Sequence, residues 1–447
     1  MKKLRTTSDL MLQCHHQQLL SIILNSRAEL HQSAMKPSNN PWIYVDISLS
    51  SVAGRYQIKV TDSQKQTVIC ENWLPTNYSS VEYLYTARLL ETSRIQLDPE
   101  NDPGQATRYQ DIVRYGQKLY KDLFGSDDKF QKYLRKSPHL QTGLRLVLRL
   151  HSNAAELWNI PWEYMHDGHS FLVVDQNYTI VRSMLDIRLG ETRNNRLPHP
   201  LRILVVTSDP IDTPRLNLDQ EVGNILEALD TAQKKGLVVV DFVEECTLHN
   251  LDAMLEEQDY HIIHYNGHGA STPKGSCLVM EDEDGKALPI FIGDFLPRIR
   301  KLKNLRLVVL NGCQTGQVEE SQATSGIATG MLQAVPAVVA MQFSIKDVSA
   351  QVFARVFYET VASGASLENA MYAARQAMQE KYPVFIDWGV PALYSHHPDI
   401  RLIDPKLQTS QLAPLEAPLQ IDGLPLPRVF VGRREEQRRL RRVLPAL

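Results

Sequence analysis

Short apolar runs that alternate with helical patterns dominate the chain after residue 200. Each run is brief and almost wholly apolar, which is typical of a strand buried on both faces of a sheet. The runs cover residues 201–206, 237–240, 261–265, 305–310 and 337–341. Helical segments are expected between several of them, at 219–234, 248–258, 321–333 and 347–362. Buried strands that alternate with helices predict an α/β fold with a mostly parallel sheet flanked by helices, over 196–403.

A different pattern precedes this sheet. Residues 42–70 are rich in β-branched and aromatic residues, and 143–150 alternate strictly between apolar and polar positions, as in a half-buried strand. We expect helices at 79–95 and 106–124, and a further strand at 171–182. These elements predict a smaller α+β unit over 42–195, called the accessory unit below, which ends in a polar linker.

Both ends of the chain differ from these two units. Residues 8–32 have apolar positions at helical spacing, so 1–41 is predicted to be an N-terminal helix and linker. This helix is either an arm that packs on the next unit or a separate recruitment module. Residues 404–428 are rich in Pro, Leu and Gln, and 404–447 is interpreted as a linker followed by the start of another region.

Composition narrows the class of protein. The chain has 447 residues, enough for about two to four domains. It is 43% hydrophobic and 22% charged, with a formal net charge of −3, which gives no reason to expect nucleic acid or an anionic membrane as a partner. No uninterrupted apolar run reaches the length of a membrane span, and the N-terminus lacks the pattern of a secretory signal.

The cysteines indicate a reducing compartment. They are odd in number and scattered, with no C-x-x-C pair, so a disulfide framework or a zinc site is not expected. A cytoplasmic location fits this pattern and leaves a thiol available as a nucleophile. The five are Cys14, Cys70, Cys246, Cys277 and Cys313.

Two strand ends carry reactive side chains among glycines. His268 lies in the Tyr-Asn-Gly-His-Gly segment 265–269, and Cys313 lies in the Asn-Gly-Cys-Gln-Thr-Gly segment 311–316. The carboxyl ends of parallel strands share one edge of a sheet, so the two side chains are expected close together. An imidazole that takes the proton of a thiol makes a nucleophile. The backbone N–H groups of Gly269 and Cys313 are candidate donors to an oxyanion.

Other candidates have plainer interpretations. Taken singly, a cysteine or a histidine near a strand end usually serves packing or a local hydrogen bond, and only the combination favours catalysis. His264 is interpreted as a packed strand residue rather than a catalytic one. The acidic run 281–285 lacks the ligand pattern of a calcium loop and is expected to form a turn. The chain has no phosphate-binding Gly-Lys-Ser/Thr loop, so ATP hydrolysis by these residues is not expected.

The two strand-end motifs resemble those of a known family. Residues 261–269 are similar to the histidine motif of CHAT domains, a bacterial branch of the caspase and separase clan, and residues 307–316 are similar to its cysteine motif. Residues 160–183 and 335–343 extend the resemblance, which covers about 115–395. It implies a caspase-like core, with a pseudo-caspase-like accessory unit in front.

The resemblance also implies an activity. Members of this kind are cysteine endopeptidases that cut polypeptides without a metal or cofactor, with His268 as the general base and Cys313 as the nucleophile. The loop after Met341 helps to shape the pocket for the residue before the cut (P1), and Asp347 lies there. An acid in that pocket would favour Arg or Lys. Asp347 could equally be the N-cap of the following helix. Asp209 is a second acidic candidate for the pocket.

The C-terminal segment 429–436 resembles the opening of STAND-type signal-transduction ATPases. The chain would then be the front part of a longer protein, acting alone or as an oligomer, whose ATPase and sensor region switches on the protease, as in bacterial relatives that act in antiphage defence. The alternative is a caspase-like interaction module that signals without cleaving anything.

Overall fold

An 11-stranded sheet runs through the described part of the chain, in the order β3-β2-β1-β4-β5-β14-β13-β12-β8-β6-β7. The computed structural model describes residues 42–78, 105–125, 128–136, 143–184, 197, 199–216, 218–243, 245–312, 318–343, 345–383, 385–397, 399–404, 420–421 and 424–425. The helices predicted at 8–32 and 79–95, and most of 404–447, lie outside these residues.

Five strands of the sheet come from the accessory unit. In β1 every second residue from Val45 to Leu49 is buried, as its alternating sequence predicts, and β2 and β3 continue the sheet as antiparallel strands. On its other side β1 pairs in parallel with β4, and β4 pairs in parallel with β5. The five are β1 (Ile43–Val52), β2 (Arg55–Asp62), β3 (Thr67–Leu74), β4 (Leu144–Leu150) and β5 (Tyr178–Met184).

Six strands come from the region after residue 196. Every residue of β8 and of β13 is buried, which explains why β13 is a continuous apolar run; β8 also carries two buried polar residues, His264 and Asn266. All neighbouring pairs among the six are parallel except β13 with β14. The six are β6 (Leu201–Thr207), β7 (Val238–Val243), β8 (Ile262–Gly267), β12 (Leu307–Gly312), β13 (Ala337–Met341) and β14 (Pro391–Ser395).

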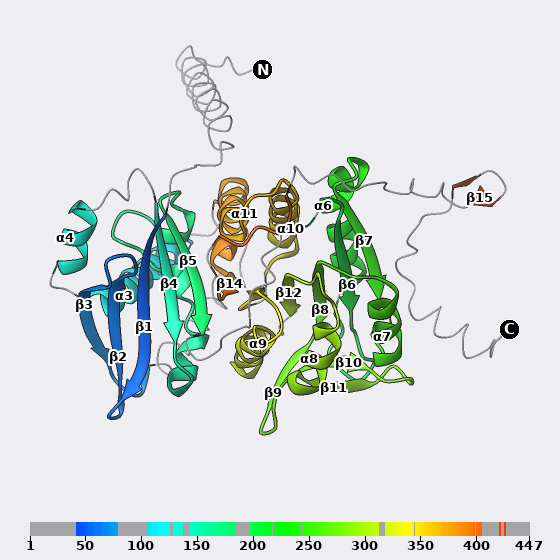
Figure 1. Cartoon of the computed structure of the whole chain (residues 1–447), viewed down its shortest axis with the longest axis horizontal. Coiled ribbons are helices and arrows are strands. Elements are labelled where there is room, and N and C mark those ends of the chain that lie inside the picture. Colours follow the sequence, from blue (N-terminus) through cyan, green and yellow to red (C-terminus); the bar gives the residue numbers. More distant parts are fainter. Residues whose placement is uncertain are drawn as a thin grey trace, which may run out of the picture. The chain divides into compact units, whose positions relative to one another are not determined.

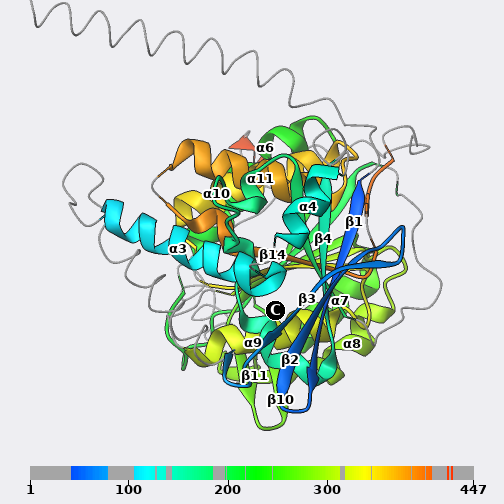
Figure 2. The same ribbon diagram turned by 90° about the vertical axis from the view of Figure 1, so that its left-hand side faces the viewer.

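Helices cover both faces of this second half of the sheet (Figure 1). Helix α10 packs against α6 and α11 on one face, while α7, α8 and α9 lie together on the other, as the turned view also shows (Figure 2). The helices of this half are α6 (Leu218–Lys234), α7 (Leu248–Glu257), α8 (Ile292–Arg300), α9 (Val318–Met331), α10 (Asp347–Ala362) and α11 (Leu367–Lys381).

Shorter elements complete the described fold. A separate three-stranded antiparallel sheet follows β8, and α3 packs against β3 in the accessory unit. The remaining strands are β9 (Gly269–Thr272), β10 (Gly275–Glu281), β11 (Ala287–Phe291), β15 (Gln420–Ile421) and β16 (Leu424–Pro425). The remaining helices are α3 (Gln105–Phe124), α4 (Lys129–Lys136), and the 3₁₀ turns η1 (Ser152–Asn159), η2 (Trp162–Tyr164), η3 (Leu172–Val174) and η4 (Asp387–Gly389).

The α/β class and the mostly parallel, helix-flanked sheet are therefore confirmed. Two details differ from expectation. The strand predicted at 171–182 is a 3₁₀ turn followed by β5, which begins only at Tyr178. Strand β4 exists, but it is buried on both faces rather than half-buried, because Arg145 on its polar face is covered and lies 3.3 Å from the Glu368 carboxylate.

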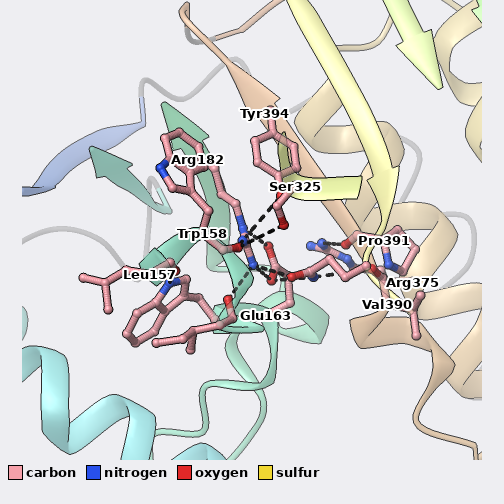
Figure 3. A network of polar contacts seen from close by, with 12 residues as sticks. Leu157, Trp158, Glu163, Arg182, Ser325, Arg375, Val390, Pro391 and Tyr394 are labelled. Carbon is pink, nitrogen blue, oxygen red and sulfur yellow. Dashed lines mark hydrogen bonds and ion pairs between the residues drawn. The ribbon is translucent and has the colours of Figure 1, made fainter. Parts of the chain in front are cut away.

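The accessory strands and the later strands meet where β5 pairs with β14, at Arg182 and Tyr394. Arg182 is fully buried there. Its guanidinium donates hydrogen bonds to the equally buried Glu163 carboxylate, at 3.0 Å from Nε and at 2.5 Å from Nη2 (Figure 3). Burial opposes the charge on Arg182, but the interactions with Glu163 and Tyr394 together outweigh this effect and leave the pKa of Arg182 above its ordinary value.

The same pair holds segments from the second half of the sheet. Arg182 Nη2 also donates to Gln342 Oε1 at 2.6 Å, and Gln342 Nε2 donates back to Glu163 Oε2 at 2.9 Å. Arg182 Nη1 donates to the Trp158 carbonyl, which also accepts from Ser325 Oγ of α9 at 3.5 Å (Figure 3). We call these five residues the junction network. Gln342 directly follows β13, so the network ties the accessory unit to the loop before α10.

Removing one partner of the central pair should be costly. We expect Glu163→Ala to lower the free energy of unfolding by about 3–5 kcal/mol, because it leaves the Arg182 charge buried without its counter-ion. Urea denaturation measures the loss. Lys234→Ala, which breaks the exposed Lys234–Asp230 pair on α6, is the control and should cost no more than about 0.5 kcal/mol. Equal effects of the two substitutions would contradict this interpretation of the junction network.

Candidate active site

His268 lies in the single-residue connection between β8 and β9. The chain can turn there because Gly267 has no side chain: a Cβ at Gly267 would lie 2.6 Å from the Tyr265 hydroxyl and 3.1 Å from Ser208 Cβ. The Tyr265 hydroxyl also lies 3.0 Å from the His268 carbonyl oxygen, which fixes the backbone at this point. The absence of a side chain at Gly267 therefore lets the backbone before His268 pack closely against Tyr265 and Ser208.

The His268 ring is held by a backbone carbonyl. Its Nε2 lies 2.8 Å from the carbonyl oxygen of Pro214, and the residue is only 7% exposed. A carbonyl oxygen only accepts hydrogen bonds, so Nε2 carries the proton and Nδ1 is the basic nitrogen of the neutral ring. Sequence reasoning missed Pro214, and no side-chain signal could have revealed it, since any residue supplies a carbonyl.

The Pro214 carbonyl belongs to a loop that follows β6. Asp209, at the start of this loop, is 7% exposed. Its carboxylate lies 3.1 Å from Arg215 Nη1 and accepts a hydrogen bond of 3.1 Å from the Leu216 backbone N–H. The structure therefore places Asp209 near His268 through the loop, with its carboxylate engaged by residues of the same loop.

Strands β8 and β12 bring the two predicted motifs side by side. They pair in parallel, with Asn266 opposite Asn311 and Gly267 opposite Gly312. His268 and Cys313 are the next residues in the two segments. Cys313 itself, within 313–317, lies outside the described residues, so the strand register, rather than a measured distance, relates the two positions.

His264 is confirmed as a packed residue of β8. Its Nδ1 lies 2.6 Å from the Tyr358 hydroxyl of α10, and its Nε2 lies 3.1 Å from Asn266 Oδ1. Burial lowers the pKa of His264 to about 4. The ring is thus neutral at pH 7, and both nitrogens already have partners, so His264 is not available as a general base.

Asp347 is the first residue of α10, and Lys346 is its N-cap residue. The interpretation of Asp347 as the N-cap is therefore wrong. Asp347 lines a small cavity of about 30 Å³, together with His264, Asn311, Met341 and Ile345. This volume admits about two water molecules, well short of an arginine side chain. The cavity lies on the α10 side of β8, β12 and β13.

The three cysteines within the described residues do not lie at a strand end among glycines, the setting predicted for Cys313. Cys70, Cys246 and Cys277 are buried and form no disulfide bond. Burial raises the pKa of Cys277, which lies in the β9–β10 hairpin and packs its sulfur 3.6 Å from the Ala270 carbonyl oxygen. A buried thiol with a raised pKa is a poor nucleophile.

The acidic run 281–285 and the possible metal and membrane sites can also be compared with expectation. The acidic run forms the expected turn, in which the Gly285 N–H donates to the Asp282 carbonyl at 2.9 Å. Within the described ranges, no group of His, Cys, Asp or Glu side chains is arranged to hold a metal ion. Among the helices that the structure describes, none has the length and apolar character needed to cross a bilayer.

Comparison with known families defines the class of this chain. The model of the CHAT domain family matches residues 113–399, which is more than half of the 447 residues. The chain belongs to the CHAT family, within the clan of caspase-like cysteine proteases. Comparison with curated proteins finds none that matches the chain.

Proposed function

We propose that the chain is a cysteine endopeptidase in which His268 is the general base and Cys313 is the nucleophile. The observation that carries this proposal is the parallel register of β8 and β12, in which Gly267 and Gly312 are direct neighbours. Both reactive residues follow these glycines, so a strand continued by one residue would put them side by side on the same face of the sheet.

The chemistry follows from the state of the His268 ring. The Pro214 carbonyl keeps the proton on Nε2, so Nδ1 is free to take the proton of the Cys313 thiol. The thiolate attacks the scissile carbonyl, and the resulting imidazolium returns its proton to the leaving amine. Water then hydrolyses the thioester and releases the free enzyme. No step needs a metal or cofactor.

The negative oxygen of the intermediate needs hydrogen-bond donors. We assign this role to the backbone N–H groups of Gly269 and Cys313. Gly269 belongs to β9, the edge strand of the three-stranded sheet. The Val279 N–H donates to the His268 carbonyl at 2.9 Å, and hydrogen-bonded pairs alternate along an antiparallel ladder, so the Gly269 N–H points away from β10. This orientation supports its role as a donor to substrate.

For substrate choice we propose a basic P1 residue recognised by Asp347. Asp347 is exposed beside the cavity at the ends of β12 and β13. The cavity must widen before an arginine or lysine can enter, and the loop before α10 is the segment that would move. Asp209 is the second acidic candidate for this pocket, but it would first have to release Arg215 and the Leu216 N–H.

We further propose that this activity is regulated from beyond residue 428. The resemblance of 429–436 to STAND ATPases, in residues outside the described ranges, supports a longer cytoplasmic protein that cleaves a protein substrate when its sensor is triggered, alone or as an oligomer. Antiphage defence is the setting in which such a design would act.

A second function is favoured by the small size of the cavity beside Asp347. A caspase-like module that binds a partner without cleaving it would need no P1 pocket. The two functions differ in the reactivity of Cys313, because a binding module has no reason to activate the thiol.

Thiol reactivity tests the catalytic pair. In the active form of the full protein, His268→Ala should slow the alkylation of Cys313 at pH 6.5 by about 10- to 100-fold, because the thiol loses the base that keeps it ionised. Cys313→Ala should abolish peptide cleavage while the thermal unfolding midpoint stays unchanged. Cys277→Ala is the matched control and should leave both rates unaltered. Alkylation of Cys313 that is indifferent to His268 would favour the binding module.

Substrate profiling tests Asp347. We expect Asp347→Asn to lower kcat/KM for a peptide with P1 arginine by about 10- to 100-fold, the loss of one charge-assisted hydrogen bond, and to spare neutral P1 residues. Asp294→Asn, which neutralises an exposed acid in the first turn of α8, is the control and should change neither value. An unaltered P1 profile in Asp347→Asn would remove this residue from the pocket.

A further inference from the structure

We infer that Asp209 is a positioning residue of the proposed active site, which holds the Pro214 carbonyl against His268 rather than binding substrate. The inference rests on the proposed function, because its role is to set the state of the His268 ring. It concerns the loop 209–216, which connects the end of β6 to the contact with His268.

The Asp209 carboxylate closes this loop around Pro214. One oxygen accepts from the Leu216 N–H at 3.1 Å, and the other lies 3.1 Å from Arg215 Nη1. Arg215 Nη1 also approaches the Asp209 carbonyl oxygen at 3.4 Å. Both residues that follow Pro214 are thus bound to Asp209. The Pro214 carbonyl is thereby fixed where it accepts from His268 Nε2 at 2.8 Å.

The rest of the loop is fixed to the β10–β11 hairpin. The Asp209 N–H donates to Glu281 Oε1 at 2.9 Å, and the Ile211 N–H donates to the Gly285 carbonyl at 2.9 Å. Asp212 Oδ1 accepts from the Ala287 N–H at 2.7 Å. These contacts hold the start of the loop, residues 209–212, to the β10–β11 hairpin. The Asp209 carboxylate holds the other end of the loop, at residues 215–216. Loss of the carboxylate should therefore loosen the Pro214 end while the start of the loop stays attached.

Burial separates this role from substrate binding. The Asp209 side chain is 10% exposed, whereas that of Arg215 is 47% exposed. The carboxylate is therefore covered, and both of its oxygens are already bound within the loop. A P1 side chain would have to displace two existing contacts to reach Asp209. Asp347, which is exposed beside the cavity, is the simpler partner for a basic residue.

A substrate-binding role and a positioning role for Asp209 predict different kinetic effects of its substitution. A specificity residue affects only substrates whose side chain it contacts, whereas a residue that sets the His268 tautomer affects every substrate and the resting thiol. The acceptor is a backbone carbonyl, which no side-chain substitution at Pro214 removes. Substitution of Asp209 is therefore the direct way to disturb it.

The experiment measures Cys313 alkylation against pH, and kcat and KM for peptides with P1 arginine and P1 glutamine, in the active form of the full protein. Asp209→Ala should lower alkylation at pH 6.5 and lower kcat for both peptides by about tenfold, with KM little changed. Asp209→Asn keeps an oxygen for the Leu216 N–H, so it should retain the fold and lose less activity. Asp230→Asn, at an exposed position of α6, should change nothing.

Coupling to Arg215 provides a second readout. If the Asp209–Arg215 ion pair acts as one unit, the double variant Asp209→Asn/Arg215→Gln should lose no more activity than the less active of the two single variants. A loss confined to P1 arginine would make Asp209 a pocket residue and overturn the inference. Alkylation that responds to His268→Ala but not to Asp209→Ala would overturn the positioning role alone. Alkylation that responds to neither would overturn the proposed function as well.

Discussion

The buried ion pair between Arg182 and Glu163 is the constraint on which the rest of the structure depends. A charge taken out of water is tolerable only when its partners are in place. Here the partners come from η2, from the residue after β13 and from the backbone before η2, and a serine of α9 shares one of the acceptors. Satisfying Arg182 therefore requires that the accessory strands and the later strands adopt one arrangement, with β5 against β14.

This arrangement reaches the candidate active site at two points. Gln342 lies between β13 and the loop that leads to Asp347, and Ser325 lies in α9, the helix that follows the Cys313 segment. The segments that follow the proposed nucleophile and line the proposed pocket are thus both bound to the accessory unit. A regulator that shifts the accessory unit relative to β14 would act on both segments at once, which gives the proposed control a physical route.

Much of this architecture could be predicted from the sequence because the signals are local. Strand β13, buried on both faces, is a continuous apolar run, and β8 begins with an apolar pair before His264. The continuity of the sheet through β14 could not be predicted, since strand order depends on contacts far apart in sequence. The burial of Arg145 could not be predicted for a related reason. Its partner, Glu368, comes from α11, which is far from β4 in the sequence.

Some parts of the candidate active site could likewise be predicted from the sequence, and others could not. His268 and Cys313 could be found because reactive side chains beside glycines at strand ends are visible in a sequence. The carbonyl that orients His268 could not, because backbone groups carry no sequence signal. The sequence leaves two roles open for Asp347, and the structure removes that of N-cap because Asp347 is already the first residue of α10 and Lys346 precedes it. Charge and position after the first strand of the core make Asp209 a second acidic candidate in the sequence, and its contacts within the loop now distinguish it from Asp347.

The most direct test of the catalytic pair is a crystal structure of the full protein with a peptide inhibitor whose electrophile forms a covalent bond with a thiol. We expect an adduct on Cys313 Sγ, with His268 Nδ1 within about 4 Å of that sulfur and Nε2 still bonded to the Pro214 carbonyl. An adduct on another residue, or an imidazole whose Nδ1 faces away from the Cys313 adduct, would contradict it.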